Sequence, residues 1–268
     1  MTTYIAGWGV LGPGLPDARA ARAVLLGERP YRDEGVRPPV VEGLSANEAR
    51  RCPTSARYAL DVGWQALRDA GWDPAGVVTV LASASGDLEI ADKNCQALAR
   101  SEIALSPTLF HNSVHNAAGG YWGIATASQA STTSLSAYDA SFAAGLLEAL
   151  TTVAPGRRCL LMAYDFPAPA AFAAARRISA PFAVALALTA DRPAGPCASL
   201  SWQWTRCDQA VVFAGMTDAA LEALRVGNSA ARSLPLLQGL SERRATTLSW
   251  ADAADMDWGL CVTLSFAP

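Results

Sequence analysis

The chain has 268 residues, of which 51% are hydrophobic and 17% charged, and its formal net charge is −3. This length and apolar fraction predict a folded globular protein with a sizeable core and exclude an intrinsically disordered chain. The slight negative charge and a pI near 5.4 exclude a basic nucleic-acid-binding surface, so no nucleic acid is expected as a partner.

The first part of the chain alternates strand-like and helix-like segments. Tyr4–Leu11 is apolar and ends in Gly-Pro-Gly, which predicts a strand and a turn. Ala18–Leu26 is rich in alanine and predicts a helix, whereas the prolines, glycines and charges of Gly27–Ala46 predict a loop. Val77–Ala84 is continuous and β-branched, which is typical of a strand buried on both faces.

The clearest helical pattern runs from Ala56 to Ala70. Its apolar residues recur on one face, Thr54 and Ser55 are expected to cap its start, and Gly71 is expected to end it. The other predicted helices are Glu89–Arg100, Ser141–Leu150 and Met216–Val226. The other predicted strands are Thr132–Ala137, Cys159–Ala163, Thr246–Trp250 and Leu260–Phe266.

Two further apolar segments, Ala183–Thr189 and Cys197–Thr205, are separated by Asp-Arg-Pro-Ala-Gly-Pro. This short connection predicts that they form neighbouring strands of a hairpin. The alternation of strands and helices as a whole predicts an α/β fold, with a mixed and mostly parallel sheet between helix layers.

The cysteines and the amino terminus indicate a cytoplasmic protein. The six cysteines include no CxxC pair and no zinc-ligand spacing, and a chain of this length does not need a disulfide framework. The first residues lack the basic and long apolar regions of a signal peptide. No apolar run reaches the ~18 residues of a membrane span, so none is expected.

The most specific signal is a block of motifs from Asn112 to Leu150. It begins Asn-Ser-Val-His-Asn-Ala-Ala-Gly-Gly and continues through a short apolar helix, a small-residue strand and a second small-residue helix. It is preceded, in order, by Tyr-Ile-Ala-Gly-Trp-Gly-Val-Leu-Gly-Pro, Ala-Leu-Arg-Asp-Ala-Gly-Trp-Asp-Pro and Val-Thr-Val-Leu-Ala-Ser-Ala-Ser-Gly-Asp. This series resembles the β-ketoacyl synthase-like N-terminal domains, which are chain-length-factor-like relatives of thiolase-fold condensing enzymes.

The resemblance implies an α/β, thiolase-like fold that corresponds mainly to the amino-terminal half of a β-ketoacyl synthase. It covers residues 1–205, which we expect to form the ketosynthase-like domain. Residues 206–268 are expected to form a shortened, divergent section that packs on the same domain. The resemblance implies no cofactor.

The chain departs from the family pattern at the catalytic positions. When the pattern is laid down without gaps from the strand Cys159–Ala163, the condensing cysteine falls on Asp139. Condensing enzymes also need two histidines from their carboxy-terminal half, whereas His111 and His115 of this chain both precede the strand-to-helix turn, or elbow, that carries Asp139. The resemblance therefore predicts no catalytic residues for condensation.

Two roles are open for Asp139. It can direct a carboxylate into a residual acyl pocket, as a base or a binding group. It can instead cap the following helix, where a carboxylate accepts backbone N–H bonds and stabilises the helix by ~0.5–2 kcal/mol. Aspartate is a poor replacement for a thiolate in acyl transfer, so we expect capping or packing.

Serine catalysis and metal binding have weaker support. Ser131 or Ser134 would need His111 or His115 within hydrogen-bond reach, and the G-x-S-x-G hydrolase elbow is missing. The two histidines are four residues apart, which suits metal ligands on one helical face, but no HExxH glutamate lies between them. We expect no metal.

The candidate substrate-binding residues are Asn116, Asp139 and Phe142. Asn116 matches the family's asparagine, and we expect a buried amide there that holds the elbow loop. Gly119 and Gly120 follow it and are expected to allow close backbone packing.

The resemblance favours a non-catalytic subunit in acyl-carrier-protein-dependent synthesis of fatty acids, polyketides or aryl polyenes. Its expected partners are a complete β-ketoacyl synthase, an acyl carrier protein, or both. In the family the strand before the elbow pairs with its twin across a two-fold axis, so Thr132–Ala137 predicts a homo- or heterodimer. The alternatives are an acyl hydrolase, acyltransferase or decarboxylase that uses Asp139 or a nearby serine, and a homo-oligomeric scaffold without acyl binding.

Overall fold

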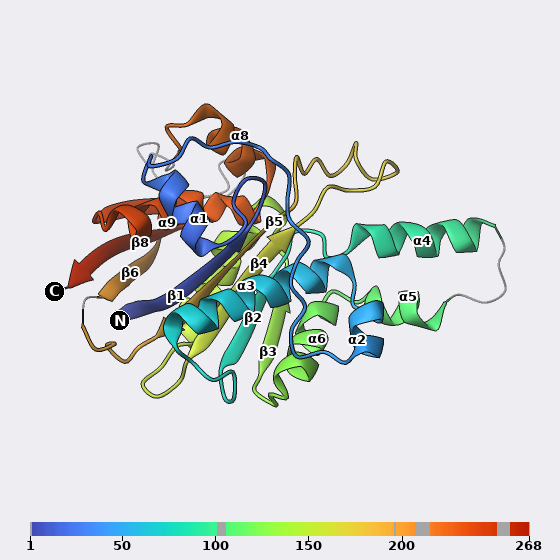
Figure 1. Cartoon of the computed structure of the whole chain (residues 1–268), viewed down its shortest axis with the longest axis horizontal. Coiled ribbons are helices and arrows are strands. Elements are labelled where there is room, and N and C mark those ends of the chain that lie inside the picture. The colour runs from blue at the N-terminus through green and yellow to red at the C-terminus, as the bar shows by residue number, and fades with distance from the viewer. Residues whose placement is uncertain (1, 101–105, 196, 207–214, 251–257, 268) are drawn as a thin grey trace.

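A computed structural model places an open sheet of eight strands between two helix layers (Figure 1). The structure describes residues 2–100, 106–195, 197–206, 215–250 and 258–267. The strands are β1 Thr3–Leu11, β2 Val78–Ala82, β3 Thr132–Leu135, β4 Cys159–Asp165, β5 Phe182–Thr189, β6 Cys197–Arg206, β7 Thr246–Trp250 and β8 Trp258–Ala267. Their order is β3-β2-β4-β5-β1-β6-β8-β7, so β3 and β7 are the edge strands.

The sheet is mixed, but it is not mostly parallel as we expected. Only β2 pairs in parallel, with β3 and β4, and the other neighbouring pairs are antiparallel. A parallel pair needs a long crossover, usually a helix, between its strands. Residues 166–181 between β4 and β5 contain turns and no helix, so the chain returns antiparallel.

The predicted hairpin of β5 and β6 is wrong, because β1 lies between these two strands. β1 pairs with β5 from Tyr4 to Leu11, but with β6 only from Thr3 to Ile5. Beyond this point, side chains of helix α3 (Thr54–Ala70) bind the free backbone groups of β1 in place of a strand. Trp8 N donates to Asp69 Oδ2 at 3.1 Å, and Val10 N donates to Gln65 Oε1 at 3.2 Å.

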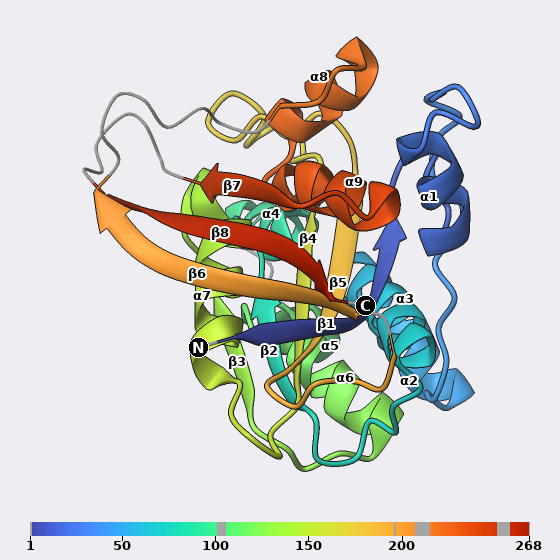
Figure 2. The same ribbon diagram turned by 90° about the vertical axis from the view of Figure 1, so that its left-hand side faces the viewer.

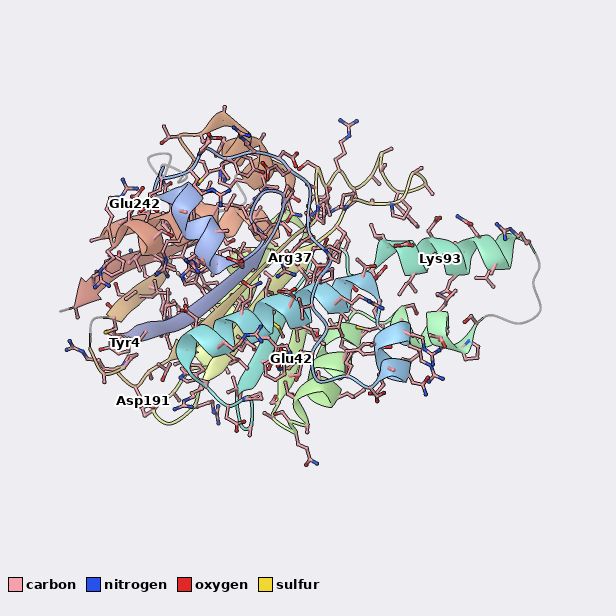
Figure 3. All side chains as sticks on the ribbon, viewed as in Figure 1. Tyr4, Arg37, Glu42, Lys93, Asp191 and Glu242 are labelled. Atoms are coloured by element: carbon pink, nitrogen blue, oxygen red, sulfur yellow. The ribbon has the colours of Figure 1, made fainter. Side chains whose placement is uncertain are left out.

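The helices occur close to their predicted positions, with three additions. They are α1 Ala18–Leu25, α2 Ala46–Arg51, α3 Thr54–Ala70, α4 Leu88–Ala99, α5 Pro107–Asn112, α6 Ala117–Thr126, α7 Ser141–Thr152, α8 Ala219–Gly227 and α9 Leu234–Glu242. The short helices α2 and α5 and the apolar α9 were not predicted individually. α4 and α5 extend away from the sheet (Figure 1), and Lys93 on α4 forms an exposed ion pair with Glu89 (Figure 3).

Helix α3 ends as predicted but begins differently. Gly71 is in the left-handed conformation, with φ of 66°, and its N–H group caps the last turn. Thr54 and Ser55 are already helical, the N-cap residue is Pro53, and it makes no side-chain cap. Ser55 instead donates to Asp87 Oδ2 at 2.9 Å.

Two hydrophobic cores lie on the two faces of the sheet. Helices α3 and α6 cover one face, and α1, α7, α8 and α9 cover the other (Figure 2). Strands β7 and β8 extend the same sheet, so part of the C-terminal section is continuous with the strands before it. The domain boundary at residue 206 stays a prediction. Of the helices that the structure describes, none has the length and apolar character to cross a bilayer.

Candidate functional site: the elbow after β3

The elbow that the sequence predicts is present between β3 and α7. The chain leaves β3 at Leu135, forms a short 3-10 turn over Tyr138–Ala140 and enters α7 at Ser141. The hydroxyl of Ser141 accepts from Ala137 N at 3.0 Å and donates to Tyr138 O at 2.6 Å. These bonds hold Tyr138 at a φ of 51°, a left-handed conformation that a bulky residue rarely adopts.

Asp139 is held by two arginines. Its Oδ1 atom accepts from Arg176 Nη1 at 2.5 Å, and its Oδ2 atom lies 3.4 Å from Arg232 Nη2. The predicted capping role of Asp139 is wrong, since the N-cap of α7 is Ala140 and this cap makes no side-chain hydrogen bond. The carboxylate is directed instead toward the β4–β5 loop and the C-terminal section.

Arg176 is the central residue of this site and is almost completely buried. It is 8% exposed, its Nε atom donates to Ser85 Oγ at 3.2 Å, and its guanidinium lies 4.2 Å from the centre of the Tyr138 ring. We call Tyr138, Asp139, Arg176 and Arg232 the elbow cluster. It joins three segments that are distant in sequence.

A buried carboxyl lies close to the cluster at the end of β4. Asp165 is 1% exposed and accepts hydrogen bonds from Ser83 Oγ at 3.0 Å, from Ala84 N at 2.8 Å and from Ser229 Oγ. Burial raises the pKa of Asp165 to about 6, although these hydrogen bonds and the charge of Arg176 oppose the rise. The carboxyl therefore ties β2 and β4 to the C-terminal section.

Asn228 completes this connection. Its Nδ2 atom donates to Asp165 O at 3.1 Å and to Ala180 O at 2.8 Å. Its Oδ1 atom accepts from Ala230 N at 2.8 Å, at the start of the 3-10 turn Ala230–Ser233 that carries Arg232. The C-terminal section thus supplies a serine, an asparagine and an arginine to the end of the sheet where β2, β3 and β4 finish.

The structure separates the other predicted site residues. Asn116 is exposed at the start of α6, so the expected buried amide is not there. The buried amide is Asn112, which is 3% exposed, donates to Arg51 O at 2.8 Å and accepts from Tyr121 Oη at 3.2 Å. Phe142 is fully buried in the other core, 5.6 Å from the ring of Trp250. A role in substrate binding for Asn116, Asp139 and Phe142 stays a prediction.

No serine and histidine pair for catalysis occurs among the residues that the structure describes. His115 Nε2 lies 3.1 Å from the carbonyl oxygen of Ser83, and His111 is exposed in the last turn of α5. The hydroxyl of Ser134 is buried without a hydrogen-bond partner there. Within the described ranges, no three metal-ligating side chains are grouped.

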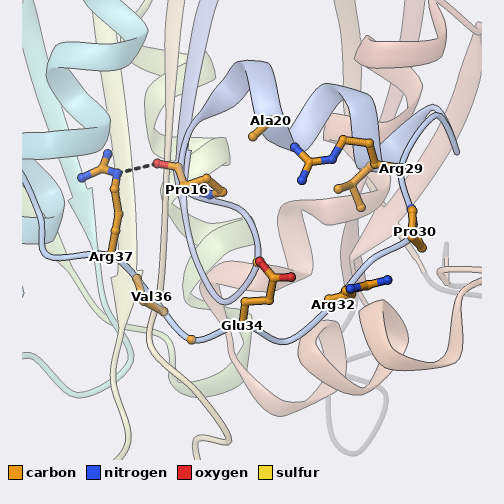
Figure 4. Close-up of a pocket in the computed structure, with 11 residues that line it drawn as sticks. Pro16, Ala20, Arg29, Pro30, Arg32, Glu34, Val36 and Arg37 are labelled. Atoms are coloured by element: carbon orange, nitrogen blue, oxygen red, sulfur yellow. Dashed lines mark hydrogen bonds between the residues drawn. The ribbon is translucent and has the colours of Figure 1, made fainter.

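A cavity on the described surface lies away from the elbow cluster. It has a volume of about 530 Å³ and opens between α1 and the loop that follows it (Figure 4). Arg29, Arg32 and Glu34 line it together with Arg37, which donates to Pro16 O and forms an ion pair with Asp61. This cavity shares no residue with the elbow cluster.

Comparison with known proteins now decides the family. Residues 27–258 match the family model described as beta-ketoacyl synthase, N-terminal domain. The chain belongs to this β-ketoacyl synthase family. No curated protein sequence matches the chain.

Solved structures agree with the family. A chain of the ketosynthase ApeO in complex with its chain length factor ApeC from Xenorhabdus doucetiae is 26% identical, with a TM-score of 0.70 over 98% of this chain and 99% of that one. A chain of the ishigamide ketosynthase/chain length factor is 14% identical, with a TM-score of 0.71 over 100% of both chains. A ketosynthase from module 6 of the Bacillus subtilis bacillaene synthase is 13% identical, with a TM-score of 0.57, and matches 87% of this chain but 46% of its own length. The fold is therefore thiolase-like.

No motif in the sequence indicated the partners of Asp139. Arg176 follows an alanine-rich stretch without periodicity, and Arg232 lies in the divergent C-terminal section. The left-handed backbone conformation in the elbow was not predicted either. It occurs at Tyr138, one position before Asp139, where the family pattern placed the condensing cysteine. The one feature of the sequence that could have indicated this site is the Tyr-Asp pair that directly follows the small-residue strand.

Proposed function

We propose that this chain is a non-catalytic, chain-length-factor-like subunit that assembles with a complete β-ketoacyl synthase. The pair would act in acyl-carrier-protein-dependent synthesis of a fatty-acid-like, polyketide or aryl-polyene-type chain. The proposal rests mainly on the elbow, where two guanidinium groups hold a carboxylate and no thiol is present.

The chemistry of condensation explains why this observation carries the proposal. The nucleophile must attack an acyl group and later leave, and a thiolate does both well. A carboxylate whose two oxygens both contact guanidinium groups is a poor nucleophile, because these contacts occupy the lone pairs that would attack an acyl group. The elbow of this chain is therefore built for charge pairing between segments.

The edge strand β3 supports the partner. Thr79 N donates to Ser131 O at 3.0 Å, and Ser83 N donates to Leu135 O at 3.2 Å, so these two carbonyls face β2. Backbone groups alternate along a strand, and those of Thr132 and Ser134 therefore face away from the sheet. Another edge strand can bind these free groups, and the similar chain from Xenorhabdus belongs to a complex of a ketosynthase with its chain length factor.

The test uses candidate β-ketoacyl synthases and acyl carrier proteins from the genome that encodes this chain. Each protein is purified, and acyl and malonyl carrier protein are incubated with this chain alone, the ketosynthase alone, or both. We expect stable association and a change in the yield or length of the product only when both are present. A β-ketoacyl product or an acyl adduct formed by this chain alone, or the absence of association, would overturn the proposal.

A further inference from the structure

We infer that Tyr138 is a principal contact through which this chain binds its ketosynthase partner, at the edge formed by β3. This inference deepens the proposed function and rests on it. Three features of this edge weaken the isolated chain: the unpaired side of β3, a strained tyrosine and an unexplained helical glycine.

Tyr138 combines backbone strain with exposure. Its φ of 51° is disfavoured for a side chain of this size, and yet 55% of the residue remains exposed. Such strain persists where the surrounding structure enforces it, and it is concentrated at functional positions. Here the two hydrogen bonds of Ser141 enforce it.

The Tyr138 side chain is already fixed in the orientation that it would present. One contact is the guanidinium of Arg176, at 4.2 Å from the ring centre, and the hydroxyl donates to Ala175 O at 3.4 Å. Fixing a side chain in advance lowers the entropy lost on binding, and tyrosine is enriched among the residues that dominate interface energy. The strain is therefore best explained by display of the ring to a partner.

Gly120 on α6 adds an independent observation beside the same strand. Its neighbour Gly119 is required, because a Cβ atom there would lie 2.7 Å from Thr132 of β3. A Cβ atom on Gly120 would meet nothing within 4 Å, and the residue is exposed. Glycine weakens a helix interior, and the open space around Gly120 leaves room for close approach by another chain.

The occupant that fits this edge is a complete β-ketoacyl synthase. The outward backbone groups of Thr132 and Ser134 can form hydrogen bonds with another strand. The exposed edge of a second thiolase-like sheet supplies such a strand. A chain that is 26% identical over almost its whole length belongs to a ketosynthase complex. A second copy of this chain is the rival occupant.

The experiment compares two substitutions by glycine, each at a residue with a φ near 50°, so that both relieve the same backbone strain. Tyr138→Gly removes the strain and the ring. Arg243→Gly is the matched control, because Arg243 has φ of 50° and also makes a cation–π contact, with Phe266 at 5.4 Å, in the C-terminal section. The melting temperature of each variant is measured alone, and its dissociation constant is measured with the purified ketosynthase that binds the wild-type chain.

We expect Tyr138→Gly to keep the melting temperature within about 2 °C of the wild type and to raise the dissociation constant at least about tenfold. Arg243→Gly should leave the dissociation constant unchanged. Gly120→Ala should raise the melting temperature and weaken binding, which tests the same surface with a variant that folds more readily.

The outcomes separate this inference from the proposed function. If the wild-type chain binds no ketosynthase, the proposed function fails. If the wild type binds but Tyr138→Gly and Gly120→Ala bind equally well, the function stands and the role of Tyr138 is refuted. If these variants disrupt only self-association, the surface belongs to a second copy and the assigned partner is wrong.

Discussion

Arg232 Nη2 lies 3.4 Å from Asp139 Oδ2, and this contact connects the C-terminal section to the turn after β3. Arg176 holds the other carboxylate oxygen from the β4–β5 loop. Asp139 therefore bridges two positive charges that would otherwise repel each other at the end of the sheet. The conformation of the elbow depends on residues that lie far along the chain.

The first prediction concerns this bridge. Asp139→Ala leaves Arg176 almost fully buried without its partner, so we expect the free energy of unfolding to fall by about 1–3 kcal/mol, since Asp139 itself is partly exposed. Arg232→Ala should cost less, because its contact is longer and more exposed. Urea unfolding at neutral pH measures both.

A double-mutant cycle distinguishes the bridge from local packing. Asp139→Ala and Arg176→Met should show a coupling energy of at least about 0.5 kcal/mol when they are combined. The control is Glu89→Ala, which removes an exposed ion pair with Lys93 and should change stability by less than about 0.5 kcal/mol. Additive effects of the first pair would show that Asp139 and Arg176 act independently.

At the elbow, the sequence predicted the path of the backbone but not the contacts of its side chains. The order of motifs predicted a turn between a small-residue strand and a helix, and the structure has that turn before Ser141. The capping role failed because helix-start rules consider only nearby backbone groups, whereas two arginines from distant segments compete for the same carboxylate. Local patterns contain no information on such contacts.

The positions of the strands were predictable from the sequence, but their order in the sheet was not. Apolar runs located all the strands that the structure describes, usually within one or two residues. The position of β1 between β5 and β6 was missed, because a short connection is typical of a hairpin and its sequence does not show an inserted third strand. Asp69 and Gln65, which complete the free side of β1, looked like ordinary polar positions on α3.

The second prediction is a pH dependence from Asp165. Burial raises its pKa in the folded protein from 3.8 to about 6, so the folded state binds more protons than the unfolded state between these values. Stability from this group is therefore highest below about pH 4 and falls as the pH rises to about 6. The rise in pKa corresponds to roughly 3 kcal/mol.

Asp165→Asn isolates this effect, because asparagine has a similar shape and does not titrate. We expect the free energy of unfolding of the wild type, minus that of the variant, to decrease between about pH 4 and pH 6 and then to remain constant. Ser83→Ala should move this decrease to higher pH, since the Ser83 hydrogen bond lowers the pKa of Asp165. A difference that stays flat from pH 4 to pH 7 would contradict the prediction.

The last prediction tests the edge strand without disturbing the fold. Thr132 is exposed, and its N–H group faces away from β2, so Thr132→Pro removes no bond between β2 and β3. It does remove a donor from the free edge and places a ring there. We expect the circular dichroism spectrum and melting temperature to change little. Association with the ketosynthase, measured by sedimentation velocity, should weaken at least about tenfold.

Thr133→Pro provides the opposite case, one residue along. The N–H group of Thr133 faces β2, so this substitution breaks the pairing of β3 and should destabilise the chain by at least about 2 kcal/mol. Charges at Ser134 or Leu135 are less informative, because the Ser134 hydroxyl is buried and Leu135 packs against the core. If Thr132→Pro binds the ketosynthase as tightly as the wild type, β3 is not the interface, and its unpaired edge is simply tolerated as a short strand of four residues.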